Sequence, residues 1–269
     1  MGLVDLHSHI LAGLDDGARG KAQSIQMARA AQRGGVSDIV ATPHFDLDSG
    51  TLSPASVLEA VEGMNLALQA EGIAVKVHPG AEVRMSAALA RPGGLPFPLE
   101  ELTICRGGTY LLVDLPAAVY PLPSDEAFFR LLLAGVTPVL AHPERNRLAR
   151  EDPGRLASLR ERGVLLQVNA GSLLGSYGRK IKRVAWRLLE EGLAHLVASD
   201  AHHPGNGSLD LAGVRGLIAS RLGDEAADLL LLHNPRRVLE GEPVPQAERP
   251  ARKGKRSRGG QRLPRSESY

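Results

Sequence analysis

The sequence contains one cysteine, Cys105, among 269 residues, so no disulfide can form within the chain. Such sparse cysteine usage is typical of a reducing compartment. The N-terminus lacks a basic segment followed by an apolar run, so we expect no secretory signal peptide. No apolar stretch approaches the roughly 18 residues that a membrane-spanning helix needs. The sequence therefore predicts a cytoplasmic protein without a membrane span.

Aromatic residues make up 3% of the chain, whereas hydrophobic residues make up 43%, so the core must consist mainly of Leu, Val, Ile and Ala. Gly-x-Gly-x-x-Gly and Gly-x-x-x-x-Gly-Lys-Ser/Thr motifs are both missing, which argues against dinucleotide and P-loop binding. A thiol phosphatase loop, Cys-x5-Arg, would need arginine where Leu111 stands. We therefore expect Cys105 to be a small buried apolar group and not a nucleophile.

Positive charge is unevenly distributed. Residues 249–269 hold eight Lys/Arg and one acid, a charge of +7, so the remaining chain carries −5 of the total +2. From residue 243 the sequence is rich in Pro, Gly and Arg, which predicts a basic, disordered tail at 243–269 after a folded domain at 1–242. The tail could bind nucleic acid, acidic polysaccharide or anionic membrane through charge alone. Since Tyr269 is its only aromatic residue, a solvated tail without a specific nucleic-acid partner is favoured.

Seven strand-like segments alternate with helix-like segments along the chain. The expected strands are 3–6, 37–42, 73–78, 109–115, 136–141, 164–169 and 193–199. The expected helices are 21–33, 54–70, 124–133, 153–162, 180–191, 209–221 and 224–233. Such alternation predicts an α/β fold with a parallel sheet covered by helices. Seven units favour a closed barrel over an open sheet.

Histidine and carboxylate side chains follow the strands. His7 and His9 stand two apart on a strand, so their side chains share one face. The other candidates lie at the ends of later strands or in the first loop: Asp16, His44, Glu82, Asp114, His142, Asp200 and His202. Parallel barrels place their chemistry at these strand ends. Nine ligands are too many for one zinc, which takes about four, and indicate two or three metals bridged by carboxylates. Without thiolates, Mn, Fe and Zn all remain open.

Some of these residue types also have ordinary structural explanations. Asp15 is more typical of a turn former or helix cap than of a ligand. The remaining histidines are expected to be structural: His78, His195, His203 and His233. A purely structural role does not readily explain Asp114, because keeping a lone carboxylate charged inside an apolar strand costs free energy. Arg145, three residues after His142, could grip phosphate oxygens, or it could be a surface salt-bridge residue.

Several blocks occur in a recognisable order, namely His7-Ser8-His9, Leu14–Gly17, Ala41–His44, Pro79–Glu82, Ala141–Arg145, Gln167–Gly175 and Ala198–His202. Together they resemble PHP-domain (polymerase and histidinol phosphatase) phosphatases. Among these, the set resembles the bacterial metal-dependent protein-tyrosine phosphatases of capsule and exopolysaccharide operons, the CpsB/CapC/YwqE type. The resemblance runs from about residue 3 to residue 240.

The resemblance implies a distorted, TIM-like (β/α)7 barrel with a trinuclear centre that often holds manganese. By position, the first metal would take His7, His9, Glu82 and Asp200, the second Glu82, Asp114 and His142, and the third Asp16, His44 and His202. Arg145 would hold the substrate phosphate. The family usually has Glu in place of Asp114, so the shorter side chain predicts weaker binding of the second metal. The family's second phosphate-binding Arg is missing from 203–208.

The implied activity is hydrolysis of phosphotyrosine, in line and by a metal-activated hydroxide, without a phosphoenzyme. The implied substrate lies on a bacterial tyrosine kinase that controls capsule or exopolysaccharide synthesis. The alternative is a small-molecule phosphomonoesterase, such as a histidinol-phosphate phosphatase. The oligomeric state is left open by the sequence.

Overall fold

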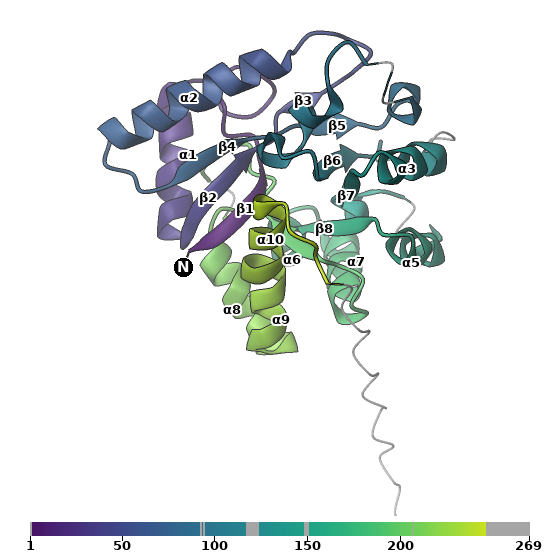
Figure 1. Cartoon of the computed structure of the whole chain (residues 1–269). Helices are drawn as coiled ribbons and strands as arrows, with labels where there is room; N and C mark the ends of the chain where they lie inside the picture. Colours follow the sequence, from purple (N-terminus) through teal and green to yellow (C-terminus); the bar gives the residue numbers. More distant parts are fainter. Residues whose placement is uncertain are drawn as a thin grey trace, which may run out of the picture.

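The computed structural model describes residues 2–91, 93, 95–116, 124–147, 151–205 and 207–245, and places the strands in the middle of the molecule with helices around them (Figure 1). The strands are β1 (Leu3–Ser8), β2 (Val36–Ala41), β3 (His44–Phe45), β4 (Lys76–Pro79), β5 (Glu82–Arg84), β6 (Tyr110–Asp114), β7 (Thr137–Ala141), β8 (Leu165–Asn169) and β9 (Leu196–Ala198). The α-helices are α1 (Lys21–Arg33), α2 (Pro54–Ala70), α3 (Ser124–Leu133), α5 (Pro153–Glu161), α6 (Ala170–Leu174), α7 (Arg179–Glu190), α8 (Leu211–Leu222), α9 (Asp224–Asp228) and α10 (Asn234–Glu240).

All strand pairs are parallel, in two sheets of order β1-β2-β4 and β3-β5-β6-β7-β8-β9. The chain runs directly from β2 into β3 and from β4 into β5, which joins the sheets on one side. On the other side, a parallel bridge links Ser8 to Ala201, and the His9 amide donates to the Ala201 carbonyl at 2.9 Å. The strands therefore close into a distorted (β/α)7 barrel, as predicted.

The second and third predicted strands correspond to β2 and β4, and the chain forms a further short strand after each of them, β3 and β5, which the sequence-based prediction missed. Pro43 has no amide hydrogen to continue the ladder after β2. A Cβ at Gly80, after β4, would lie 2.7 Å from Val40 Cγ1, so this position needs glycine for the close approach of the two strands. After both breaks the chains pair again as β3 and β5, where His44 is the direct partner of Glu82. The interruption thus brings two predicted ligands side by side.

The long helices match their predicted ranges, whereas the C-terminal ones differ. The predicted bounds of α1, α2 and α3 are confirmed, and Ser53 caps α2 by accepting a hydrogen bond from the Ser56 amide at 3.1 Å. The single helix predicted for 224–233 is instead α9 followed by a π-helix, η6 (Leu229–His233). The short helices α6 and α10 were not predicted, since five and seven residues are too few for a clear helical period.

Two clusters of buried side chains form the core. The larger cluster lies between the strands and the surrounding helices. The smaller combines alternate residues of six strands, such as Tyr110 and Leu112 of β6 and Val139 of β7, and therefore fills the inside of the barrel. Ile104 and Val238 complete this cluster near the N-terminal ends of the strands. The opposite, C-terminal ends are left for polar side chains.

The chain beyond the last helix is described only as far as Pro245. The Tyr110 hydroxyl donates to the Glu242 carbonyl at 2.6 Å and accepts from the Val244 amide at 3.2 Å, so this segment lies against the barrel. The rest of the predicted tail, 246–269, lies outside the described residues. Within the described part of the chain, no helix combines the length and the apolar character needed to cross a membrane.

Two glycine substitutions test the packing of the helices. A Cβ at Gly34, after α1, would lie 2.2 Å from the Leu209 carbonyl oxygen, so Gly34→Ala should destabilise the protein by about 1–3 kcal/mol. Gly63 lies in α2, with no atom within 4 Å of a Cβ built there, so Gly63→Ala should stabilise by about 0.5–1 kcal/mol. Thermal unfolding should show Tm moving in opposite directions, and a shared direction would contradict this packing.

Candidate metal centre

Histidine and carboxylate side chains converge at the C-terminal ends of the strands. Among the described residues, three groups could each hold a metal ion, because the ligand atoms within a group all lie within 4.8 Å of one another. The groups are His7, His9 and Asp200; His7, Glu82 and His142; and His9, Asp16, His44 and His202. Because His7 and His9 each belong to two groups, the three form one continuous cluster.

The His-x-His pair presents both rings to the same place. The Nε2 atoms of His7 and His9 are 3.2 Å apart, and both rings are buried. His7 Nδ1 lies 2.9 Å from Gln167 Oε1, and His9 Nδ1 lies 2.6 Å from Asp15 Oδ2. Each ring therefore donates its Nδ1 hydrogen outward and leaves the Nε2 lone pair directed into the cluster.

Glu82, at the start of β5, is the hub of the cluster. Its Oε2 atom lies 2.8 Å from His44 Nδ1 and 3.4 Å from the Nε2 atoms of His7 and His9. Its Oε1 atom lies 2.8 Å from His142 Nε2. Oε2 is buried and accepts no hydrogen bond of good geometry from the described residues. A carboxylate oxygen facing three imidazole nitrogens in this way is well placed to share a cation with them.

Asp200 connects the cluster to Arg145. Asp200 Oδ1 lies 3.4 Å from the Nε2 atoms of both His7 and His9, while Oδ2 accepts a hydrogen bond from Arg145 Nη1 at 2.8 Å. Arg145 belongs to a short turn, η5 (Pro143–Arg145), directly after β7, and its side chain is 35% exposed. A guanidinium at this depth can reach both the cluster and a ligand from solvent.

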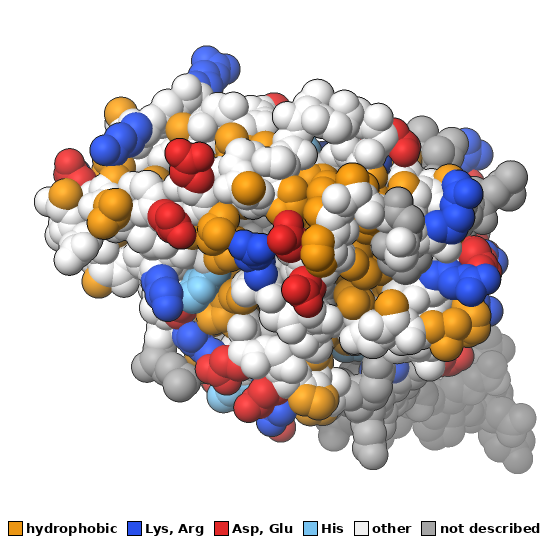
Figure 2. All heavy atoms as spheres, turned by 45° about the horizontal axis from the view of Figure 1, so that its top comes forward, with side chains coloured by type: hydrophobic (Ala, Val, Ile, Leu, Met, Phe, Trp, Pro, Cys, Tyr) orange, Lys and Arg blue, Asp and Glu red, His pale blue; other side chains and the backbone are white. Residues whose placement is uncertain are grey.

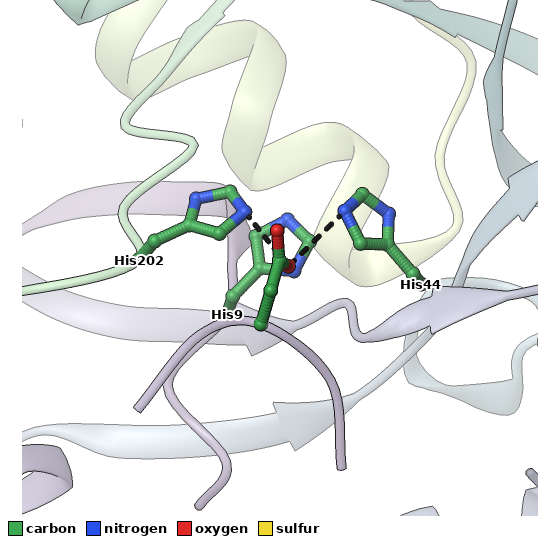
Figure 3. Close-up of side chains that lie close together, drawn as sticks. His9, His44 and His202 are labelled. Atoms are coloured by element: carbon green, nitrogen blue, oxygen red, sulfur yellow. Dashed lines mark ion pairs between the residues drawn. The ribbon is translucent and has the colours of Figure 1, made fainter. Parts of the chain in front are cut away.

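The third group lies at the solvent side of the cluster. Figure 3 shows the imidazoles of His9, His44 and His202 converging from three segments of the chain. Asp16 Oδ1 lies 3.4 Å from the Nε2 atoms of both His44 and His202 (Figure 3, dashed lines), and the Asp16 side chain is 70% exposed. This group is therefore open to solvent, in contrast to the buried Glu82.

Asp114 is the one predicted ligand outside the three groups. It lies on the same side of β6 as Tyr110 and Leu112, four and two residues earlier, so it faces the inside of the barrel. Its Oδ1 atom lies 3.8 Å from His142 Nδ1, on the side of that ring away from Glu82. Burial raises the pKa of Asp114 above the usual value. The structure thus leaves it close to the cluster, with a short side chain.

Four supporting residues were not recognised in the sequence. Asp15 does form a turn, since its Oδ1 accepts from the Gly17 amide at 2.9 Å, but its Oδ2 also holds His9 and accepts from the His44 amide at 3.0 Å. Gln167 donates to Asn169 Oδ1 at 2.9 Å, and Asn169 donates to Asp200 Oδ2 at 2.5 Å. The sequence did contain a signal for Gln167 and Asn169: they stand two apart at the end of a strand, so their side chains share one face.

Tyr177 is the fourth supporting residue. It lies in the turn between α6 and α7, and the Arg145 guanidinium carbon is 4.6 Å from the centre of its ring. This is the geometry of a cation–π contact. Burial raises the pKa of Tyr177, so the hydroxyl stays neutral at ordinary pH. No sequence pattern links position 177 to 145, because the contact depends on how α7 packs against η5.

The electrostatics of the cluster favour a bound cation. Burial opposes charge on Glu82 and on His9, but their contacts outweigh it: the neighbouring histidines, His7 first, hold the pKa of Glu82 well below its usual value. Asp15, Asp200 and Glu82 raise the pKa of His9 well above its usual value. The pKa of His142 rises to about 9, since its contact with Glu82 overcomes burial. The carboxylates therefore draw positive charge into the site.

Two residues of the cluster have a strained backbone. Of the four non-glycine residues with positive φ in the described chain, His142 (+31°) and Asp200 (+49°) lie here, whereas Cys105 and Arg106 lie in the short turn η4 (Ile104–Arg106). Each such conformation costs of order 1–3 kcal/mol and is often found at functional sites. His142 directly follows β7, Asp200 follows β9 after one residue, and the turn of the backbone directs their side chains into the cluster. This strain was not visible in the sequence.

The residues predicted to be structural stay outside the cluster. His78 Nε2 lies 2.9 Å from Asp38 Oδ1, and His195 Nδ1 accepts from the Leu166 amide at 3.0 Å. His203 and His233 belong to none of the three groups found among the described residues. Cys105 packs against the inner core near the opposite end of the barrel, and burial raises its pKa to about 11. A thiol of this kind is a poor nucleophile.

The donor set fits divalent metal ions. Imidazole nitrogens and carboxylate oxygens suit Mn, Fe and Zn, and Gln167 and Asp15 orient His7 and His9 as outer partners commonly orient metal-binding histidines. Glu82 Oε2, which accepts no hydrogen bond of good geometry from the described residues, faces three imidazole nitrogens. Histidines crowded around buried carboxylates at 2.8–3.4 Å make a site able to bind metal.

The sequence is similar to known tyrosine phosphatases. Tyrosine-protein phosphatase YwqE of Bacillus subtilis (strain 168) is 40% identical over 201 residues, which cover 75% of this chain and 78% of the relative. Tyrosine-protein phosphatase CpsB of Streptococcus pneumoniae is 25% identical over 244 residues, which cover 88% of this chain and 98% of the relative.

The structure agrees with this similarity. A solved structure from work describing YwqE from Bacillus subtilis and CpsB from Streptococcus pneumoniae as metal-dependent tyrosine phosphatases matches with a TM-score of 0.82 at 35% identity, covering 90% of this chain and 96% of that one. The phosphotriesterase homology protein from Escherichia coli shares the fold at a TM-score of 0.53 and 15% identity, covering 88% and 98%. The family model for "Capsular polysaccharide synthesis, CpsB/CapC" matches residues 3–240. The chain thus belongs to the CpsB/CapC family.

Proposed function

We propose that this protein is a metal-dependent phosphatase that hydrolyses phosphotyrosine in proteins. The proposal rests on one observation: Arg145, a residue able to bind phosphate, lies beside the three groups of potential metal ligands and donates to Asp200 Oδ2 at 2.8 Å. Relatives named tyrosine-protein phosphatases support the choice of substrate. Bound divalent ions would polarise the phosphoryl oxygens and activate water for attack on phosphorus.

The proposed ligands divide by burial. His7, His9, Glu82 and Asp200 would hold a first ion in the buried part of the cluster, with Glu82 shared with a second ion near His142 and Asp114. Asp16, His44 and His202 would hold a third ion on the solvent side. Because Asp114 lies outside the three groups, we expect the second ion to bind most weakly. Manganese is our first choice of metal, with Fe and Zn as alternatives.

Arg145 would bind the substrate phosphate. Its guanidinium is fixed on one side by Asp200 Oδ2 and on its face by the Tyr177 ring, which leaves the remaining N–H groups to donate to phosphate oxygens. Fixing the guanidinium in advance lowers the ordering entropy lost on binding. Gln167 and Asp15 would keep the His7 and His9 rings in place during the reaction.

The proposed setting is the bacterial cytoplasm, with the phosphorylated tail of a tyrosine kinase that controls capsule or exopolysaccharide synthesis as substrate. The family description as capsular polysaccharide synthesis supports this context. We propose 1–242 as the catalytic domain and 243–269 as a basic tail outside it.

Metal removal and reloading test the activity. Purified protein treated with a chelator should lose hydrolysis of phosphotyrosine peptides, because the proposed attack on phosphorus needs water activated by bound ions, and Mn should restore it. Released phosphate measures the rate, with histidinol phosphate as the comparison substrate. Reloaded protein with full metal content that leaves phosphotyrosine peptides intact would refute the proposed function, and a higher kcat/KM on histidinol phosphate would favour a small-molecule phosphatase.

His7→Ala tests the buried ligands. Since His7 belongs to two of the three groups, its loss should reduce bound metal and lower kcat/KM by about 10²-fold or more. The barrel should remain folded, as seen by circular dichroism and by a single thermal transition. His78→Ala, which removes a histidine outside the cluster, serves as the control. Full metal content and activity in His7→Ala would mean that the pair is structural.

Tyr177→Ala tests the contact with Arg145. Loss of a cation–π contact of about 0.5–2 kcal/mol should lower kcat/KM about two- to thirtyfold, mainly through KM. Tyr177→Phe keeps the ring and should stay within about twofold of the unmodified enzyme. In a double-mutant cycle, Tyr177→Ala should have little further effect once Arg145 is already alanine. Additive losses would show that Tyr177 acts independently of Arg145.

A further inference from the structure

The first half of α7 carries a cluster of exposed cations, which we call the α7 basic surface: Arg179, Lys180, Lys182 and Arg183. No acidic residue occurs in this helix before Glu190. Like charges three and four residues apart on a helix repel each other, so Arg179 disfavours both Lys182 and Arg183. The arrangement does not stabilise the helix and is better explained by an anionic partner.

Cations further along the helix are neutralised, whereas these are not. Arg187 pairs with Glu191 at 3.4 Å, and Arg221 of α8 pairs with Glu190. Within the described chain, Arg179, Lys180 and Arg183 make no ion pair, and Lys182 Nζ contacts only a carbonyl oxygen, that of Leu174, at 3.2 Å. On the face shown in Figure 2, Lys/Arg and Asp/Glu side chains are interspersed, and hydrophobic side chains gather near the centre.

A hollow of about 420 Å³ runs beside this surface. Its lining includes Arg179, Lys182 and Arg183 from the basic surface. Further along it includes Arg221 and its ion-pair partner Glu190, and the Arg221 guanidinium stacks 4.5 Å from the centre of the Trp186 ring. A concave surface of this charge can receive extended polypeptide with acidic side chains.

The α7 basic surface begins next to the candidate active site. Tyr177, which stacks against Arg145, stands two residues before Arg179. The turn η5, which contains Arg145, packs against α7. Because β8 leads through α6 into α7, this helix begins at the end of the barrel that holds the cluster. A chain whose phosphate reaches Arg145 would therefore leave the site beside these cations.

We propose that the α7 basic surface docks acidic side chains that flank the phosphotyrosine of a protein substrate. This inference rests on the proposed function and adds a preference for acidic sequence. Helical residues rise 1.5 Å each, so Arg179 and Arg183 are about 6 Å apart along the axis, close to two residues of an extended peptide. The preferred acids should thus lie within a few positions of the phosphotyrosine. Because the α7 basic surface lies next to Arg145, the proposed phosphate-binding residue, we favour a peptide over DNA or a membrane as its partner.

The test compares two double variants that remove the same charge. Arg179→Gln/Arg183→Gln alters the basic surface, whereas Arg33→Gln/Lys76→Gln removes two exposed cations from α1 and β4 as the control. With a phosphotyrosine peptide rich in Glu, the first variant should raise KM about five- to tenfold at unchanged kcat. With p-nitrophenyl phosphate, which is too small to reach the surface, both variants should match the unmodified enzyme.

Several results would overturn the docking proposal. An unchanged KM for the acidic peptide, an equal loss on p-nitrophenyl phosphate, or an equal effect of the control variant would each do so. Fluorescence anisotropy with an unphosphorylated Glu-rich peptide tests docking without catalysis, and binding that depends on Arg179 and Arg183 would support it even if phosphotyrosine is never hydrolysed. Tighter binding of duplex DNA or phosphatidylserine vesicles at the same residues would also reject the peptide assignment.

Discussion

The burial of Glu82 is the constraint on which the rest of the site depends. A carboxylate with no exposed side-chain surface is costly unless polar or positively charged partners surround it. Here four histidine rings face it, and they come from the ends of β1 and β7 and from β3. The interruption at Pro43 and Gly80 brings His44 and Glu82 together as partners in β3 and β5. Without this carboxylate, the imidazoles would face one another with no acidic group between them to accept their contacts.

The barrel makes that convergence possible. Its inner core fills the end near Ile104 and Val238, and the polar side chains occupy the other end. Gln167 and Asn169 continue the inward row of Leu165 and form a hydrogen-bonded path from His7 to Asp200. Arg145 extends the path to solvent and meets Tyr177. Metal binding, phosphate binding and the proposed peptide docking therefore share one continuous structure.

Much of this could be predicted from sequence, because strand–helix alternation and residue spacing are local properties. The long helices matched, and the nine predicted ligands fall at one end of the barrel because parallel strands end together. The prediction failed where distant segments decide the outcome. Asp15 was explained as a turn former, although its second oxygen holds His9. The short strands β3 and β5 were missed, since two and three residues are too few to show a strand period and their pairing joins distant segments.

The sequence by itself determined the kind of fold, the donor types and their order along the chain, since each follows from periodicity and from spacing over a few residues. Tertiary structure alone decided that Glu82 would be the hub, that Asp114 would stand apart at 3.8 Å from His142, and that Tyr177 would stack on Arg145. It also placed the cations of α7 beside the site. These relations join residues far apart in the chain, and they depend on how buried charge and packed helices share the limited space at one end of the barrel.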